Sequence, residues 1–220
     1  HSRSSGLGHC SVALVDRIMG AVRRAWPLAN DIEITLEANP GSVETQRFAG
    51  YRLAGVDMVS LGVQALDDRD LRRLGRLHSV EDAMNALEVC RSVFDRVSID
   101  LIYARQDQSV EAWRSELSRA LDFGLDHLSL YQLTIENGTA FGDRFAAGGL
   151  RGLPDETRSI DLWDVTQRMA ETAGLPAYEV SNHARPGQES RHNMLYWEGG
   201  DYVGIGPGAH GRERLQEVRY

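Results

Sequence analysis

One stretch, residues 58–103, is the clearest indication of the fold of this 220-residue chain. Its sequence is MVSLGVQALDDRDLRRLGRLHSVEDAMNALEVCRSVFDRVSIDLIY. The stretch opens with MVSLGVQ (58–64) and closes with RVSIDLIY (96–103), two short apolar runs that predict strands. Between them, Ser79 is followed three residues later by Asp82, the pattern of a capped helix start, and this helix should run to about Phe94. A strand, a helix and a second strand in this order predict a βαβ unit with parallel strands.

The same alternation continues on both sides of this unit. Apolar residues recur at helical or at strand-like spacing in turn, and glycine or proline separates the segments. Two architectures fit this order, a doubly wound sheet and a β/α barrel that is whole or partial. Further strands are predicted at 32–36, at 127–135 and within 176–184, and further helices at 15–26, 48–53, 109–124 and 155–174, whereas 136–154 is predicted to be irregular.

Composition narrows the class of protein. The apolar fraction is 42%, the charged fraction is 25% and the net charge is −8, which makes a general nucleic-acid surface improbable. No apolar run approaches the roughly 20 residues that cross a bilayer, and no signal peptide is visible. With only Cys10 and Cys90, we expect a reducing, cytoplasmic setting, and we interpret Cys90 as a buried structural thiol on a helical face.

Polar side chains follow the apolar part of each predicted strand. Buried parallel strands should be mostly apolar, so these residues are either loop residues that happen to follow a strand or the lining of one shared site. In a β/α barrel the carboxyl ends of the strands form a mouth where active sites lie, and we predict such a site here. The residues are Glu37, Gln64, Asp100, Gln132, Thr134, Glu179 and Asn182.

The residue types indicate the chemistry of a ligand. Carboxylate and amide groups accept hydrogen bonds, which suits a ribose diol or an ammonium group. Arg76 has the geometry to hold a carboxylate with two hydrogen bonds, although a solvated arginine at a helix end is an equally good interpretation. An amino acid joined to a nucleoside would use the whole set.

Seven ordered motifs carry a family resemblance across about residues 11–212. Together they resemble the radical S-adenosylmethionine (SAM) proteins related to oxygen-independent coproporphyrinogen III oxidase, and most closely the heme chaperone branch of that family. The resemblance implies a partial (β/α)6 TIM-like barrel of the radical-SAM type, incomplete at its N-terminal end, with SAM bound at the mouth. The motifs are ITLEANPG, SLGVQALDDRDLRRLGRLHS, SIDLIYARQDQS, HLSLYQLTIENGT, YEVSNHARPG, RHNMLYW and GIGPGAHG.

The resemblance also assigns residues. By family position, Glu37 and Arg76 would hold the ammonium and the carboxylate of the methionine part of SAM. Gln64 and Asp100 would face the ribose, and Thr134 would lie near the nucleoside.

The motif His-Asn-x-x-Tyr-Trp in RHNMLYW is associated in this family with heme. His192 would then be an axial ligand of the heme iron, and Tyr196 and Trp197 would pack on the porphyrin. The simpler alternative is that His192 hydrogen-bonds a loop while the aromatic residues fill the core. GIGPGAHG (204–211) would be a tight loop whose glycines let the backbone approach the barrel mouth. Its match to a dinucleotide fingerprint is rejected, because Pro207 interrupts it and no βαβ unit can follow.

The chain departs from the family in several places. The CxxxCxxC motif that binds a [4Fe-4S] cluster is absent, and Cys10 and Cys90 cannot replace three closely spaced thiolates. ARQDQ (104–108) replaces a loop that more commonly carries glycine and proline. We therefore expect residues 1–10 to be a tag remnant or the edge of a cluster loop and 11–182 to be the partial barrel. Residues 183–220 would be a porphyrin-proximal segment leading to a C-terminal domain.

Three functions stay open at this point. The first is a heme chaperone that delivers heme to partner proteins. The second is an oxidase that decarboxylates two propionates of coproporphyrinogen III through a 5′-deoxyadenosyl radical, with an electron donor to its cluster. The third is a barrel without a cluster that serves as an interaction module. No catalytic residue is assigned from the sequence.

Overall fold

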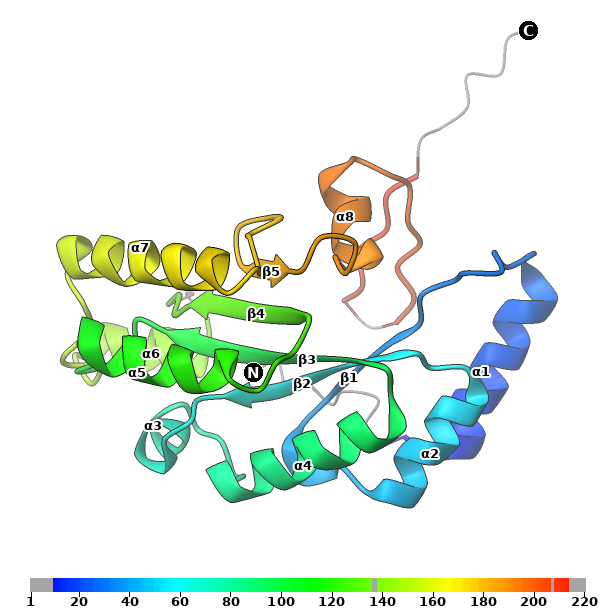
Figure 1. The fold of residues 1–220 in the computed structure, drawn as a ribbon, viewed down its shortest axis with the longest axis horizontal. Coiled ribbons are helices and arrows are strands. Elements are labelled where there is room, and N and C mark those ends of the chain that lie inside the picture. The colour runs from blue at the N-terminus through cyan, green and yellow to red at the C-terminus, as the bar shows by residue number, and fades with distance from the viewer. Residues whose placement is uncertain (1–9, 136–137, 207, 214–220) are drawn as a thin grey trace, which may run out of the picture.

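The computed structural model describes residues 10–135, 138–206 and 208–213. The expected tag or loop segment 1–10 lies outside these residues except for Cys10, and so does Pro207. The described chain is an α/β structure in which helices alternate with the strands of one sheet (Figure 1). Its elements are α1 (Val12–Ala25), β1 (Thr35–Ala38), the 3-10 turn η2 (Pro40–Ser42), α2 (Thr45–Ala54), β2 (Met58–Gln64), α3 (Asp68–Arg73), α4 (Val80–Val93), β3 (Arg96–Tyr103), α5 (Val110–Leu121), β4 (His127–Gln132), α6 (Ala140–Ala146), α7 (Glu156–Thr172), β5 (Asn182–Ala184) and α8 (Arg191–Trp197).

The strands lie in the sheet in their order along the chain, β1-β2-β3-β4-β5. The first four are parallel to one another, which confirms the βαβ units predicted from residues 58–103. Each new parallel strand is added on the same side of the previous one. This sequential order is that of a β/α barrel, whereas in a doubly wound fold the strands are added first on one side of the sheet and then on the other. The described strands form an open sheet, so the barrel is partial, as expected.

The fifth strand differs from the prediction, because it runs antiparallel to β4. The chain enters this region through Ala177, which bridges His183, and the Tyr178 amide donates to the Asn182 carbonyl. The residues between them make a tight reversal, so the segment 182–184 pairs with β4 on its way back. This short hairpin replaces the parallel strand that the alternation indicated.

The long helices begin and end where local signals place them. Ser79 and Asp82 form a complete capping box on α4, and the Ser109 hydroxyl accepts from the Ala112 amide at the start of α5. Gly55 ends α2 with a φ of 110°, a conformation that glycine adopts without steric cost. Three short helices, α3, α6 and α8, were not predicted. No helix in the described ranges is both long and apolar enough to cross a membrane.

The core lies between the sheet and the helices that follow its strands. Side chains alternate between the two faces of a strand, and one set of alternate residues packs under α2, α4, α5 and α7. Trp113 of α5 is fully buried, stacks on Tyr103 with ring centroids 5.2 Å apart, and donates from its indole nitrogen to Thr166. Cys90 is also fully buried, as predicted. The strand residues of this face include Leu36, Val59, Leu61, Ile99, Leu101, Leu128 and Leu130.

Candidate ligand site on the open face of the sheet

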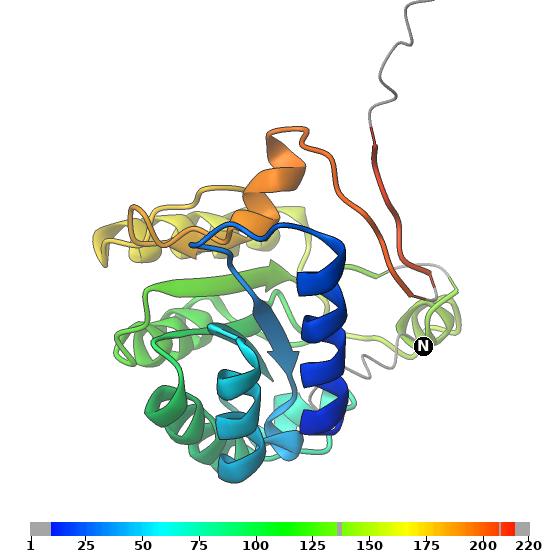
Figure 2. The ribbon, with the colours of Figure 1, turned by 90° about the vertical axis from the view of Figure 1, so that its right-hand side faces the viewer.

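The other face of the sheet, which we call the open face, carries a cavity of about 800 Å³. In Figure 2, α2, α4 and α5 lie on one side of the sheet, and residues 201–206 and 208–212 lie on the other. Alternate strand residues and the start of α8 line the cavity, and most of them are polar. The lining residues are Ile32, Glu33, Thr35, Glu37, Met58, Ser60, Asp100, His127, Ser129, Tyr131, Asn182, Ser190, Arg191, His192, Asn193 and Leu195.

A row of polar side chains crosses the open face from β1 to β5. Glu37 is in register with Ser60, and Asp100 is in register with Ser129. The Ser60 hydroxyl donates to Asp100 Oδ1 at 2.9 Å, and the Ser129 hydroxyl donates to Asn182 Oδ1 at 2.7 Å. Parallel register thus brings together residues that are far apart in the sequence.

Asp100 is the centre of this row. Its burial in the sheet raises its pKa to about 6, with the neighbouring Glu37 charge adding to the effect, while the Ser60 hydrogen bond and the Arg76 charge oppose it. Burial, together with the charge of Asp100, also raises the pKa of Tyr131 to about 12. A carboxylate held partly desolvated in this way should attract a cationic or hydroxyl-bearing ligand.

Gln64 and Arg76 complete this group at the carboxyl end of β2. The Arg76 Nη2 donates to Gln64 Oε1 at 3.2 Å. Burial lowers the pKa of Arg76, and the Asp100 charge opposes that effect. Four of the predicted SAM residues are therefore connected, because the charge of Asp100 interacts with those of Glu37 and Arg76, and Arg76 bonds Gln64.

Thr134 does not join this group. It lies beyond the end of β4, its side chain is exposed, and its hydroxyl donates to the Gln132 carbonyl at 3.2 Å. Like Gln64 and Arg76, it is not among the residues that line the cavity.

The segment RHNMLYW forms α8. This helix lies at the amino end of the parallel strands, whereas Gln64 and Arg76 lie at their carboxyl end (Figure 1). Glu33, just before β1, accepts from the backbone amide of Arg191 at 3.0 Å. Arg96, the first residue of β3, pairs with Glu33 at 2.6 Å and also donates to the carbonyl of Gln188. The start of α8 is thus fixed to the amino ends of β1 and β3. The seven residues of β2 separate the two ends of the sheet by about 20 Å.

A hydrogen-bonded chain anchors α8 a second time. The Tyr178 hydroxyl accepts from Asn193 Nδ2 at 3.0 Å and contacts His127 Nε2 at 2.7 Å. This hydroxyl accepts from Asn193 and also from the Ser190 amide, so both of its acceptor sites are used and it donates its one proton to His127 Nε2. His127 Nδ1 then donates to the Ser98 hydroxyl at 2.7 Å. Burial lowers the pKa of His127 to about 4, so the ring is neutral at physiological pH.

His192 lies on the exposed side of α8 and lines the cavity. Its ring meets Tyr196 edge to face, with centroids 4.8 Å apart, and Tyr196 meets Tyr202 at 4.5 Å. Within the described ranges, neither ring nitrogen of His192 has a hydrogen-bond partner. Trp197 is 59% exposed. The alternative in which these aromatic residues fill the core therefore does not hold for Trp197.

Tyr202 and Arg212 form an antiparallel bridge, and the described residues of the glycine-rich segment, 204–206 and 208–211, lie between them. A Cβ at Gly204 would lie 2.1 Å from the carbonyl oxygen of His210, so only glycine fits there. This accounts for the tight loop expected from the sequence. Its described residues do not line the cavity.

Sequence reasoning missed Glu33, Ser60, Ser129 and Tyr178. The two serines could have been found, because each is a polar residue inside an apolar strand. Ser60 is in register with Glu37, and Ser129 is in register with Asp100. Glu33 and Tyr178 left none, because their partners lie far away along the chain.

Residues 11–116 match the model of the radical SAM superfamily. The chain carries a radical SAM domain. The heme chaperone HemW of Escherichia coli is 42% identical over 203 residues, which cover 92% of this chain and 52% of that protein. The mitochondrial radical S-adenosyl methionine domain-containing protein 1 of Mus musculus is 44% identical over 199 residues, 90% of this chain and 45% of that protein. The chain thus spans about half the length of these curated relatives.

Solved structures agree on the fold. Coproporphyrinogen III oxidase HemN from Escherichia coli superposes with a TM-score of 0.74 at 23% identity, over 91% of this chain and 49% of that one. Elp3 of Methanocaldococcus infernus superposes with a TM-score of 0.61 at 18% identity, over 73% and 42% of the two chains. These likenesses show that the chain has the same α/β fold.

The radical SAM family implies a [4Fe-4S] cluster and SAM. The residues present do not fit the cluster, because three thiolates are needed and the chain has two cysteines, 80 positions apart. In the described ranges no group of three His, Cys, Asp or Glu side chains has the arrangement of a metal site. The residues do fit SAM, since Asp100 and Glu37 supply carboxylates, Arg76 supplies a guanidinium and Gln64 supplies an amide.

Proposed function

We propose that this chain is the SAM- and heme-binding part of a heme chaperone that delivers heme to partner proteins in the cytoplasm. The observation that carries the proposal is the position of α8. It presents His192, with both ring nitrogens available, beside exposed Tyr196 and Trp197. Imidazole is a common axial ligand of heme iron, and aromatic side chains suit the porphyrin face.

SAM would be held at the carboxyl end of the same face. Glu37 and Arg76 would hold its ammonium and carboxylate groups, and Gln64 and Asp100 would face its ribose. Each charge-assisted contact shielded from water contributes about 1.5–3 kcal/mol. Bound with a reduced cluster, SAM supplies a 5′-deoxyadenosyl radical. The cluster would need cysteine ligands from outside these 220 residues, and its reduction would need an electron donor. Thr134 stays a candidate for the nucleoside, although its exposed side chain gives it no support.

The likeness to HemW of Escherichia coli, at 42% identity over 92% of this chain, favours a chaperone over an oxidase. Heme ligated by His192 would enter the α8 side of the cavity that Glu37 and Asp100 also line. We keep the oxidase as the second candidate because of the likeness to HemN, which shares this fold.

The test is a heme titration of the full-length protein and its His192→Ala variant, followed by the Soret band. We expect the Soret band of the complex to shift or disappear in the variant while the far-ultraviolet circular dichroism stays unchanged. His210→Ala is the matched control, because it removes another exposed histidine and should leave the spectrum as it is. An unchanged spectrum for His192→Ala would refute the assignment.

Two further measurements separate the other functions. Formation of protoporphyrinogen IX from coproporphyrinogen III by the protein with a reconstituted cluster would favour the oxidase. An interaction module would bind no SAM, so SAM binding by the full-length protein that is lost in Asp100→Ala would count against it.

A further inference from the structure

The loops after β2 and β3 hold their backbones in an uncommon conformation. Among the described residues other than glycine, positive φ occurs at Gln64 (73°), Ala104 (60°) and Asp107 (59°). Side chains with a Cβ seldom adopt this region, so the surrounding structure must enforce it. All three residues lie at the carboxyl ends of β2 and β3, beside the proposed SAM group.

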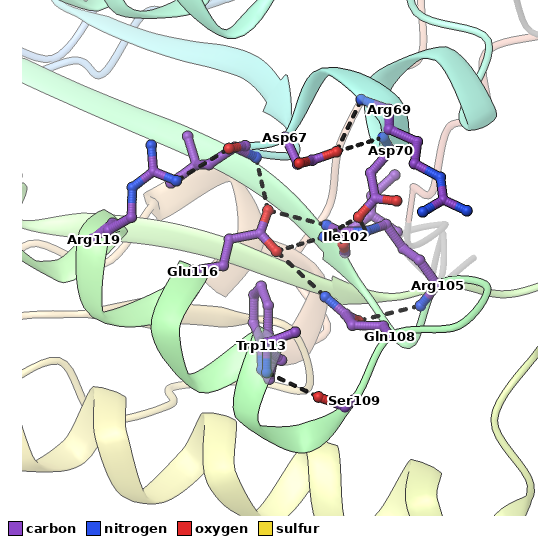
Figure 3. A network of polar contacts seen from close by, with 12 residues as sticks. Asp67, Arg69, Asp70, Ile102, Arg105, Gln108, Ser109, Trp113, Glu116 and Arg119 are labelled. Carbon is purple, nitrogen blue, oxygen red and sulfur yellow. Dashed lines mark hydrogen bonds and ion pairs between the residues drawn. The ribbon is translucent and has the colours of Figure 1, made fainter.

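A largely buried ion-pair network connects these two loops to α3 and α5 (Figure 3). Arg105 is 4% exposed and pairs with Glu116 of α5 through two nitrogens, at 3.2 and 2.5 Å. It also donates to Asp70 of α3 from Nε and Nη2, and to the Ile102 carbonyl from Nη1. All five N–H donors of the guanidinium are therefore used, which no other side chain can reproduce.

The network holds the segment between Gln64 and Arg76 at two points. Glu116 Oε1 accepts from the Leu66 amide at 2.7 Å, and Arg119 of α5 donates to the Leu66 carbonyl at 3.2 Å. Both backbone groups of Leu66, two residues after Gln64, are thus bound by α5. Four residues further on, Asp70 is bound by Arg105.

The position of α3 in turn fixes Arg76. The Arg76 amide donates to the carbonyl of Leu71 in α3, so the backbone of Arg76 moves with that helix. We propose that Arg105 and Glu116 are positioning residues that hold the segment 64–76 so that Gln64 and Arg76 face the ligand. The proposal rests on SAM binding as the function of that group.

The experiment compares SAM affinity and hydrogen exchange in the full-length protein and its Arg105→Met variant. SAM affinity is measured by equilibrium dialysis with labelled SAM, and exchange is followed in peptides that cover 64–76 and 191–197. We expect the affinity to fall about tenfold and exchange in 64–76 to accelerate, with 191–197 unchanged. Arg185→Met is the matched control, because it removes an exposed arginine that pairs with Asp126 at the other end of the sheet.

A second substitution separates positioning from general stability. Ala104→Gly, made in the Arg105→Met background, removes the cost of the positive φ but restores no contact to Leu66 or Asp70. It should raise the thermal midpoint without recovering SAM affinity. If Arg105→Met does not fold, Glu116→Gln replaces it, since glutamine keeps the volume and an acceptor for Leu66 but loses the charge.

The outcomes are distinct. A folded Arg105→Met variant with unchanged affinity and unchanged exchange in 64–76 would overturn the proposal, and so would recovery of affinity by Ala104→Gly. If the unsubstituted protein binds no SAM, the proposed function fails, and the exchange in 64–76 then decides by itself whether the network holds this segment.

Discussion

Replacing Asp100 by asparagine should stabilise the protein at neutral pH. Burial raises the pKa of this carboxyl from its ordinary 3.8 to about 6. Well below pH 4 the group is protonated in the folded and the unfolded states, so it does not change the free energy of unfolding. Well above pH 6 it is ionised in both states, and burying the charge then lowers the free energy of unfolding by about 3 kcal/mol.

The sign follows from proton binding. Between pH 4 and pH 6 the folded state binds more protons than the unfolded state at this site, so stability from Asp100 falls as the pH rises. Asparagine is neutral throughout and can still accept from Ser60. The stability of the variant minus that of the wild type should therefore increase by up to about 3 kcal/mol from pH 4 to pH 7.

Urea unfolding at several pH values between 4 and 8 measures this difference. Asp126→Asn is the control, because it makes the same substitution at an exposed carboxylate instead of a buried one. The reasoning is refuted if the Asp100→Asn difference is flat or falls with pH. A confirmed slope would mean that the candidate site keeps a charge at a cost in stability, as sites that bind cationic ligands often do.

Two further changes test other parts of the structure. Tyr178→Phe should cost about 1–3 kcal/mol in urea unfolding, because it leaves His127 Nε2 and Asn193 without a shared partner, and an unchanged midpoint would contradict the assigned chain of hydrogen bonds. Cys90 should resist a thiol reagent at pH 8 in the folded protein, since burial raises its pKa to about 12, whereas Cys10 should react; equal labelling of the two would show that Cys90 is accessible.

Local patterns in the sequence predicted correctly those features of the fold that depend only on neighbouring residues. The capping pair Ser79 and Asp82 lies within one helical turn, and α4 begins where this pair predicts. The short helices α3 and α8 were missed because six or seven residues are too few to display a helical period. The predicted direction of β5 was also wrong. A tight reversal near residue 180 turns the chain back on itself, and the alternation of strands and helices in the sequence gives no sign of this turn.

Some residues of the candidate site could likewise be proposed from local sequence patterns, and others could not. Glu37 and Asp100 could be proposed from the sequence because a polar residue inside an apolar strand is visible there. Glu33 could not, because its partner Arg191 is 158 residues away and only folding brings the two together.

The βαβ order, the helix caps and the polar residues on the strands could all be predicted from the amino-acid sequence, since these features depend on spacing over a few residues. That Gln64 and Arg76 lie at one end of the sheet and His192 at the other became visible in the folded chain. The tertiary structure also decided that α5 holds Leu66 through Glu116. The physical reason is that register and packing join residues through space, and these contacts leave no regular spacing along the chain.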